Sequence, residues 1–111
     1  MERINAHDLA YRAGDSGPKY LFRGPLHEWG VMRLLPGQSM GHHFHNEVEE
    51  TFYFPQCAPL IIINGESLRV RPGDAFRLPA TDKHDIVNDT SEPIDIVFIK
   101  CPYLPNDKVN C

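Results

Sequence analysis

Turn-forming residues recur along this chain at intervals too short for long helices. The 111 residues include ten prolines and eight glycines, and several of them form pairs such as Gly24-Pro25, Pro36-Gly37, Asn64-Gly65 and Pro72-Gly73. The segments between these pairs are rich in β-branched and aromatic residues, and an Asn-Gly pair between two such segments is typical of a β-hairpin. The pattern therefore predicts an all-β fold of short antiparallel strands, either a sandwich or a barrel.

We expect strands in nine segments that lie between the turns: residues 4–11, 20–22, 29–35, 51–54, 60–63, 67–71, 75–78, 84–87 and 94–99. Residues 1–36 then supply N-terminal strands, while Pro102 and Pro105 predict an irregular tail over residues 101–111. A chain of 111 residues is expected to form one domain, since domains usually contain roughly 100–200 residues.

The net charge, the cysteines and the apolar segments argue against nucleic-acid binding, a disulfide framework and a membrane span. The formal net charge of −4 disfavours a nucleic-acid partner, because phosphates bind basic surfaces. Cys57, Cys101 and Cys111 are widely spaced and form no Cys-x-x-Cys pair, which disfavours a disulfide framework and a thiolate zinc site. Residues 1–5 lack an apolar signal core, and the longest aliphatic run, residues 60–63, is too short to cross a membrane. We therefore expect a soluble, cytoplasmic protein without a membrane partner.

The segment from Gly37 to Glu50 concentrates the residues that bind metals. It places three histidines and three glutamates within nine positions. Imidazole nitrogen and carboxylate oxygen bind divalent first-row metals where no thiolate is present. Side chains two residues apart on a strand share a face, so His43 and His45 can reach one ion while His42 points to the opposite face. This segment therefore predicts one half of a metal site.

A second segment, residues 72–88, can supply the other half, because His84 begins a strand after a proline-containing turn. Together the two segments resemble the paired motifs of the cupins, small jelly-roll barrels in which both motifs contribute to one metal site. The motifs lie within residues 37–50 and 73–88 and, with the strand between them, cover about half of the chain. The positions that match at the family's spacing are Gly37, His43, His45 and a glutamate in the first motif, and Gly73, Pro79, His84 and Asn88 in the second.

The sequence departs from the cupin motifs at two positions. Thr81 stands where the second motif has a glycine, which alters a turn. The glycine that closes the first motif is absent, and residues 56–59 (Gln-Cys-Ala-Pro) occupy that turn. The second departure leaves the shape of the loop and the assignment to a subfamily open.

Two neighbouring glutamates compete for the carboxylate position of the first motif. Glu49 and Glu50 both lie at a permitted spacing from His45, so spacing alone does not decide between them. Register favours Glu50, because strand alternation then directs Phe52 and Phe54 into the barrel beside the carboxylate. Glu49 remains the alternative.

The resemblance implies a single jelly-roll barrel with one divalent transition metal per subunit, an ion of iron, manganese, nickel, cobalt, copper or zinc. Its ligands would be His43, His45, Glu50 and His84. Such an ion can act as a Lewis acid or activate water. The family then suggests a metal-dependent oxygenase, decarboxylase, isomerase or lyase acting on a small acid or sugar, and the alternative is a non-catalytic binding or sensing module.

The resemblance also directs attention to contacts with a small-molecule ligand. Arg33 and Arg77 each lie between apolar neighbours next to a motif, and an arginine can bind a carboxylate or phosphate with two hydrogen bonds. Phe52 is a third candidate contact. Cupins of this size are often homodimers, and residues 20–22 are candidates for pairing across the subunit boundary.

Overall fold

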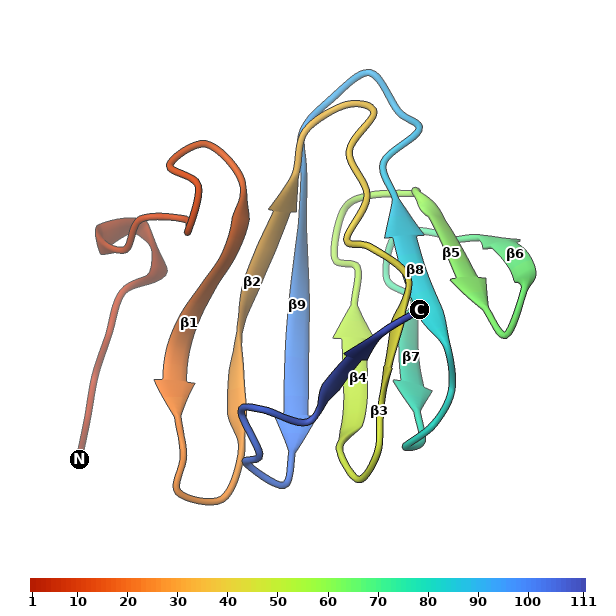
Figure 1. Cartoon of the computed structure of the whole chain (residues 1–111). Helices are drawn as coiled ribbons and strands as arrows, with labels where there is room; N and C mark the ends of the chain where they lie inside the picture. The colour runs from red at the N-terminus through yellow and green to blue at the C-terminus, as the bar shows by residue number, and fades with distance from the viewer.

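Ten strands form two five-stranded antiparallel sheets in the computed structural model, which describes residues 1–111 (Figure 1). One sheet has the order β1-β2-β9-β4-β7 and the other the order β10-β3-β8-β5-β6. The strands are β1 (Gly17–Arg23), β2 (Glu28–Leu34), β3 (His43–His45), β4 (Glu49–Tyr53), β5 (Leu60–Ile63), β6 (Glu66–Arg69), β7 (Ala75–Leu78), β8 (His84–Val87), β9 (Ile94–Cys101) and β10 (Lys108–Asn110).

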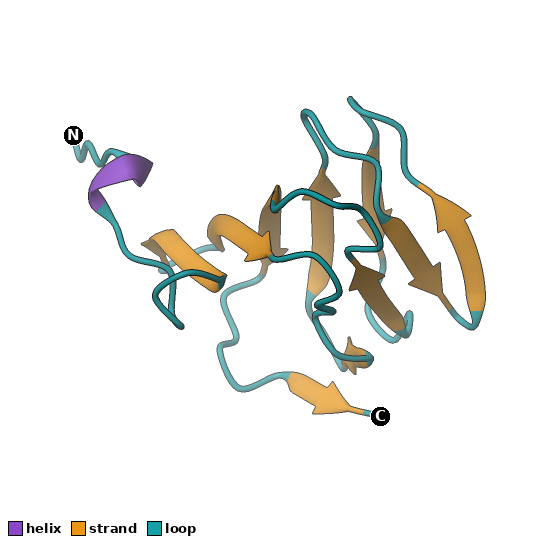
Figure 2. Cartoon of the chain, turned by 90° about the horizontal axis from the view of Figure 1, so that it is seen from above, coloured by secondary structure: helices purple, strands orange, loops and turns teal.

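The path of the chain between the sheets is that of a jelly roll. From β2 onward, successive strands alternate between the two sheets, except for the β5–β6 hairpin, which stays within one sheet. Figure 2 shows that strands and loops make up almost the whole chain, with one short helical turn near the N-terminus. The all-β jelly-roll fold expected from the sequence is therefore confirmed.

The core lies between the inner faces of the two sheets, and strand alternation decides which side chains reach it. Along β9, Ile94, Ile96 and Phe98 are buried at every second position. Each such side chain contributes roughly 1.5–3 kcal/mol by leaving water. The same alternation directs Lys100, the next residue in this series, toward the inside of the molecule. Hydrophobic burial therefore also orients a charged side chain.

The expected ranges 60–63, 75–78 and 84–87 match β5, β7 and β8, and the ends of the other confirmed strands differ by up to three residues. The strand expected over residues 4–11 was wrong, because this segment contains the 3-10 helix η1 (Ala6–Asp8). The side chain of Asn5 accepts a hydrogen bond from the backbone N–H of His7 at 2.9 Å, which stabilises a helical start. This three-residue helix is the only one in the structure, and no helix has the length and apolar character needed to cross a bilayer.

The tail expected to be irregular lacks a strand or helix over residues 102–107, but it ends in β10, so the expectation was wrong for residues 108–110. β10 pairs with β3, with Lys108 opposite His45 and Asn110 opposite His43. The backbone hydrogen bonds that define β10 join residues more than sixty positions apart in the sequence, and no local pattern announces them. The last strand thereby lies beside the histidine-rich segment (Figure 1).

Candidate metal centre

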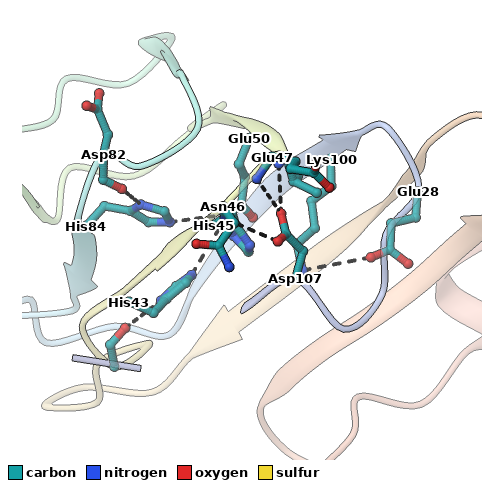
Figure 3. Close-up of polar contacts among 12 residues, drawn as sticks. Glu28, His43, His45, Asn46, Glu47, Glu50, Asp82, His84, Lys100 and Asp107 are labelled. Carbon is teal, nitrogen blue, oxygen red and sulfur yellow. Dashed lines mark hydrogen bonds and ion pairs between the residues drawn. The ribbon is translucent and has the colours of Figure 1, made fainter. Parts of the chain in front are cut away.

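Three strands bring together four side chains of the two motifs. His43 and His45 come from β3, Glu50 from β4 in the facing sheet, and His84 from β8, where it is the register partner of His43. All four side chains are buried, and their candidate ligand atoms lie within 4.8 Å of one another (Figure 3). The group therefore lies between the two sheets and is shielded from bulk water.

The imidazole rings converge on one carboxylate oxygen. The Nε2 atoms of His45 and His84 lie 3.0 Å and 3.2 Å from Glu50 Oε1, and that of His43 lies 3.9 Å away. Strand alternation produces this arrangement, because His43 and His45 are two residues apart on one face of β3.

Backbone carbonyls orient two of these rings. His43 Nδ1 lies 2.7 Å from the carbonyl oxygen of Gly41, and His84 Nδ1 lies 2.9 Å from that of Asp82. A carbonyl oxygen only accepts hydrogen bonds, so in both rings Nδ1 carries the hydrogen and donates it. In the neutral ring, Nε2 then presents a lone pair toward Glu50.

Glu50 is ionised although it is only 1% exposed. Burial raises the pKa of its carboxyl group, but the imidazoles of His43, His45 and His84 lower it by more when Nε2 also carries a hydrogen that points at the carboxylate, and the Lys100 ammonium lowers it further. The pKa therefore lies well below its usual range, and the side chain carries a negative charge at neutral pH.

This group of atoms fits a divalent metal ion. Lone pairs on imidazole nitrogens that face a carboxylate repel one another unless a cation or protons lie between them. Ligand atoms on opposite sides of an ion, with metal–nitrogen distances of about 2.1 Å, are about 4.2 Å apart, which is only slightly less than the 4.8 Å span observed here. Three imidazoles and a carboxylate also form a ligand set that first-row metals accept. The cluster can therefore hold such an ion.

The structure places Glu50, and not Glu49, with the histidines. The side chain of Glu49 is 50% exposed on the other face of β4, and its Oε1 lies 3.9 Å from Arg77 Nε. His42 is also outside the cluster, with its Nδ1 3.6 Å from Cys111 Sγ. Glu47 is exposed.

Asp107, which precedes β10, holds the loop that connects His45 to Glu50. Its carboxylate accepts hydrogen bonds from the backbone N–H groups of Asn46, Glu47 and Val48 at 3.2, 2.8 and 2.9 Å (Figure 3). These bonds, led by the one from Glu47, lower the pKa of Asp107 below its usual value. Because β3 and β4 lie in different sheets, this anchor helps to set the distance between two of the clustered side chains.

The other motif positions shape the turns around the cluster. Asn88 is fully buried; its Nδ2 donates to the carbonyl oxygens of Leu34 and Glu92, and its Oδ1 accepts from Thr90. Thr81, which replaces a motif glycine, has a φ of +77° and donates its backbone N–H to the carbonyl oxygen of His45 at 2.7 Å. A β-branched residue rarely adopts this left-handed conformation.

A cavity of about 460 Å³ adjoins the cluster, with His43, His45 and Glu50 in its wall. Apolar side chains including Met32, Met40 and Phe98 form part of the lining. Its charged side chains apart from the cluster are Arg12, Arg23, Glu28, Lys100 and Lys108. The volume lies in the range of small-molecule sites, about 300–1,000 Å³.

Arg33, Arg77 and Phe52, the residues expected to contact a ligand, do not line this cavity. Arg33 points to the outer face of β2, where it forms a two-bond pair with Asp95 at 2.9 Å for each bond. Arg77 is 76% exposed, and Phe52 is fully buried in the core with its ring centroid 5.6 Å from that of His84. In both arginines the strand alternation that buries the adjacent leucine directs the charged side chain outward.

Sequence reasoning missed Glu28 and Lys100 as cavity residues. For Lys100, a signal was present in the alternation of Ile94, Ile96 and Phe98, which extends by one further step to position 100. For Glu28, the signal was the alternation of β2, in which Met32 and Leu34 lie on the same face as position 28.

Comparisons with known proteins agree with this geometry. Residues 30–100 match the family model described as the cupin domain. Over 80 residues the chain is 26% identical to the tetracenomycin polyketide synthase protein TcmJ of Streptomyces glaucescens; this match covers 72% of the chain and 54% of that protein. The chain thus spans about half the length of this curated relative.

Among solved structures, a protein from Klebsiella pneumoniae with a double-stranded β-helix domain superposes with a TM-score of 0.83 at 20% identity, covering 100% of this chain and 98% of that one. A sugar phosphate isomerase of the cupin superfamily from Silicibacter pomeroyi gives a TM-score of 0.65 at 24% identity, covering 69% of this chain and 51% of that one. At these levels of identity, the similarity establishes the fold.

Proposed function

The chain belongs to the cupin family, and on that basis we propose that it holds one divalent transition metal ion and binds a small acid- or sugar-like ligand beside it. The ligands of the ion would be His43, His45, Glu50 and His84. The observation that carries the proposal is the convergence of three buried imidazoles on one ionised carboxylate at the wall of a cavity.

The chain's own residues prepare the site for this task. The carbonyl groups of Gly41 and Asp82 fix the orientation of two imidazoles, so that Nε2 is free to bind a cation. Glu50 would balance part of the charge of the ion. When bound, the ion would supply Lewis-acid chemistry or activate a water molecule. A ligand in the cavity would lie next to it.

The family and the cavity together support reactions of small oxygen-rich molecules, in the range of oxygenases, decarboxylases, isomerases and lyases. The similarity to a sugar phosphate isomerase supports a sugar-like ligand. A non-catalytic binding or sensing module is the alternative, and one contact favours it. Glu28, the cavity carboxylate outside the cluster, is already engaged in an ion pair of 2.8 Å with Arg23.

Elemental analysis of the purified protein, before and after addition of divalent metals, tests the metal site. We expect about one metal ion per chain, and we expect His84→Ala to reduce the bound metal well below this value. The matched control is His27→Ala, because His27 is exposed and lies outside the cluster. If neither the purified nor the reconstituted protein holds metal, both the catalytic and the non-catalytic form of the proposal are wrong.

A panel of small acids and sugars then separates the two forms. An enzyme should convert at least one compound and lose this turnover in the His84→Ala variant. A binding module should bind a compound in a metal-dependent way and release it unchanged.

A further inference from the structure

Charged side chains of alternating sign form a row across the sheet that carries Glu50. Arg23 of β1 is the register partner of Glu28 in β2, Glu28 that of Lys100 in β9, and Lys100 that of Glu50 in β4. Register partners on antiparallel strands have Cα atoms about 4.5–5.5 Å apart and direct their side chains to the same face. The row therefore leads along the cavity wall to the His43, His45, Glu50 and His84 cluster, and Figure 3 labels its members Glu28, Lys100 and Glu50.

The two residues at the outer end of this row, Arg23 and Glu28, already form an ion pair with each other. Arg23 Nε donates to Glu28 Oε2 at 2.8 Å, and the Glu28 side chain is only 2% exposed. The Arg23 guanidinium also lies over the ring of Tyr20, 4.1 Å from its centroid. Both contacts hold the Glu28 carboxylate in place and leave Arg23 engaged.

Lys100 differs, because its ammonium group has hydrogen-bond donors to spare. The group has three N–H donors, yet its one hydrogen bond, to Tyr20 Oη, is long at 3.3 Å. Glu28 Oε1 lies 4.0 Å away, beyond hydrogen-bond length. The side chain is 19% exposed and lines the cavity, so its unused donors can reach a ligand there.

The charge of the cavity favours an anion. Arg12, Arg23, Lys100 and Lys108 line it, against only Glu28 and Glu50, although the chain as a whole has a net charge of −4. A metal ion would add to this local excess of positive charge. An incompletely paired ammonium in a shielded site is costly unless a ligand satisfies it.

We propose that Lys100 determines which ligand is bound, by pairing with the carboxylate of a small hydroxy acid or sugar acid whose hydroxyl groups lie toward the metal cluster. This rests on the proposed function, since the ligand must occupy the cavity beside the ion. Within the row a carboxylate suits this position better than a phosphate, because Lys100 offers a single positive charge while the neighbouring Arg23 guanidinium is bound to Glu28. Arg23 and Glu28 act as positioning residues that keep Lys100 beside the cavity.

Calorimetric titration of the metal-loaded protein with three related six-carbon compounds tests the proposal. D-gluconate carries a carboxylate, D-sorbitol is its neutral counterpart, and D-sorbitol 6-phosphate carries a phosphate instead. We expect D-gluconate to bind about tenfold or more tightly than D-sorbitol, as is typical of a hydrogen-bonded charge pair. Lys100→Met should abolish this preference, and Lys100→Arg should restore part of it.

Lys83→Met is the matched control, because it removes the same charge from an exposed position next to a cluster residue and should keep the preference. Elemental analysis of every variant separates loss of ligand from loss of metal. A Lys100→Met protein that holds metal and still prefers D-gluconate would overturn the inference, as would a wild type that binds D-gluconate no better than D-sorbitol or that prefers the phosphate. A wild type that holds no metal would overturn the proposed function instead.

Discussion

Glu50 and Lys100 face each other across β4 and β9 as register partners. The carboxylate on which three imidazoles converge therefore has an ammonium group one strand away, and this ammonium contributes to the low pKa of Glu50. One wall of the molecule thus carries both a candidate metal ligand and a cavity cation. A substitution at either position must be assessed for metal binding and for ligand binding separately.

The two adjacent glutamates should differ sharply in their effect on metal affinity. Glu50→Ala removes the buried carboxylate from the cluster, and we expect metal affinity to fall by about tenfold or more, since hydrogen bonds and contacts to charged groups have this order of strength. Glu49→Ala should have little effect, because Glu49 is half exposed on the opposite face. Titration with cobalt or zinc measures both. Equal losses in the two variants would contradict the geometry of the cluster.

Removing the Asn88 side chain should be strongly destabilising. Asn88→Ala would remove the buried bond to the carbonyl group of Leu34 and the bond to that of Glu92, which keeps a hydrogen bond from Thr90 Oγ1. We expect a loss of about 2–4 kcal/mol in the free energy of unfolding. Asn46→Ala is the control, with an expected change within about 0.5 kcal/mol, because Asn46 is exposed. Urea unfolding of the metal-free proteins makes the comparison, and similar losses in both would argue against a special role for Asn88.

Glycine at position 81 should stabilise the protein. The left-handed backbone of Thr81, with φ of +77°, costs about 1–2 kcal/mol for a residue with a side chain. The greater entropy of glycine in the unfolded chain offsets about 0.5–1 kcal/mol of this, so we expect Thr81→Gly to gain about 0.5–1 kcal/mol. Thr51→Gly within β4 should instead be destabilising, since Thr51 has extended backbone. A stability loss in Thr81→Gly, measured by urea unfolding, would refute the strain argument.

The pair of Asp95 and Arg33 should make stability depend on pH in the acid range. Burial raises the pKa of Asp95, but hydrogen bonds from Arg33 and Tyr11 lower it by more, so its pKa in the folded protein lies below that in the unfolded chain. The stabilisation is therefore present above the unfolded pKa of about 3.9 and is lost as pH falls through the folded pKa.

We expect Asp95→Asn to lower the free energy of unfolding at pH 7 by about 1 kcal/mol or less, because the pair is partly exposed. The difference from wild type should shrink as pH falls below about 4. Asp8→Asn, at an exposed position without a side-chain hydrogen bond, should change stability little. Unfolding curves at several pH values provide the measurement, and a difference that grows toward low pH would contradict the sign of the shift.

Strong local signals made much of the fold predictable. The strands β5, β7 and β8 are bounded by turn residues such as Asn64-Gly65 and Pro72-Gly73, so their ends could be placed from the sequence. The grouping of His43 and His45 with His84 was predictable for a related reason. Period-two spacing sets the faces of short strands, and the paired motifs specify which distant strand meets them.

Features that depend on long-range pairing could not be predicted in this way. β10 is recognisable only from its partner β3, and the row that joins Glu28, Lys100 and Glu50 exists only through the register of three strands. Arg33 shows that a local signal can also be misinterpreted. Its apolar neighbours suggested an inward position, but one step of strand alternation placed it on the outer face with Asp95.

β10 also determines which backbone is left unpaired at the edge of its sheet. With β10 in place, β3 is an interior strand, and the exposed edge beside it is only three residues long. Very short edge strands are poor templates for pairing with another chain, whereas a free edge exposes unpaired N–H and C=O groups to such pairing. The segment that follows β9 thus pairs the outer backbone groups of the histidine-bearing strand, and the strand left at the edge, β10, carries none of the clustered side chains.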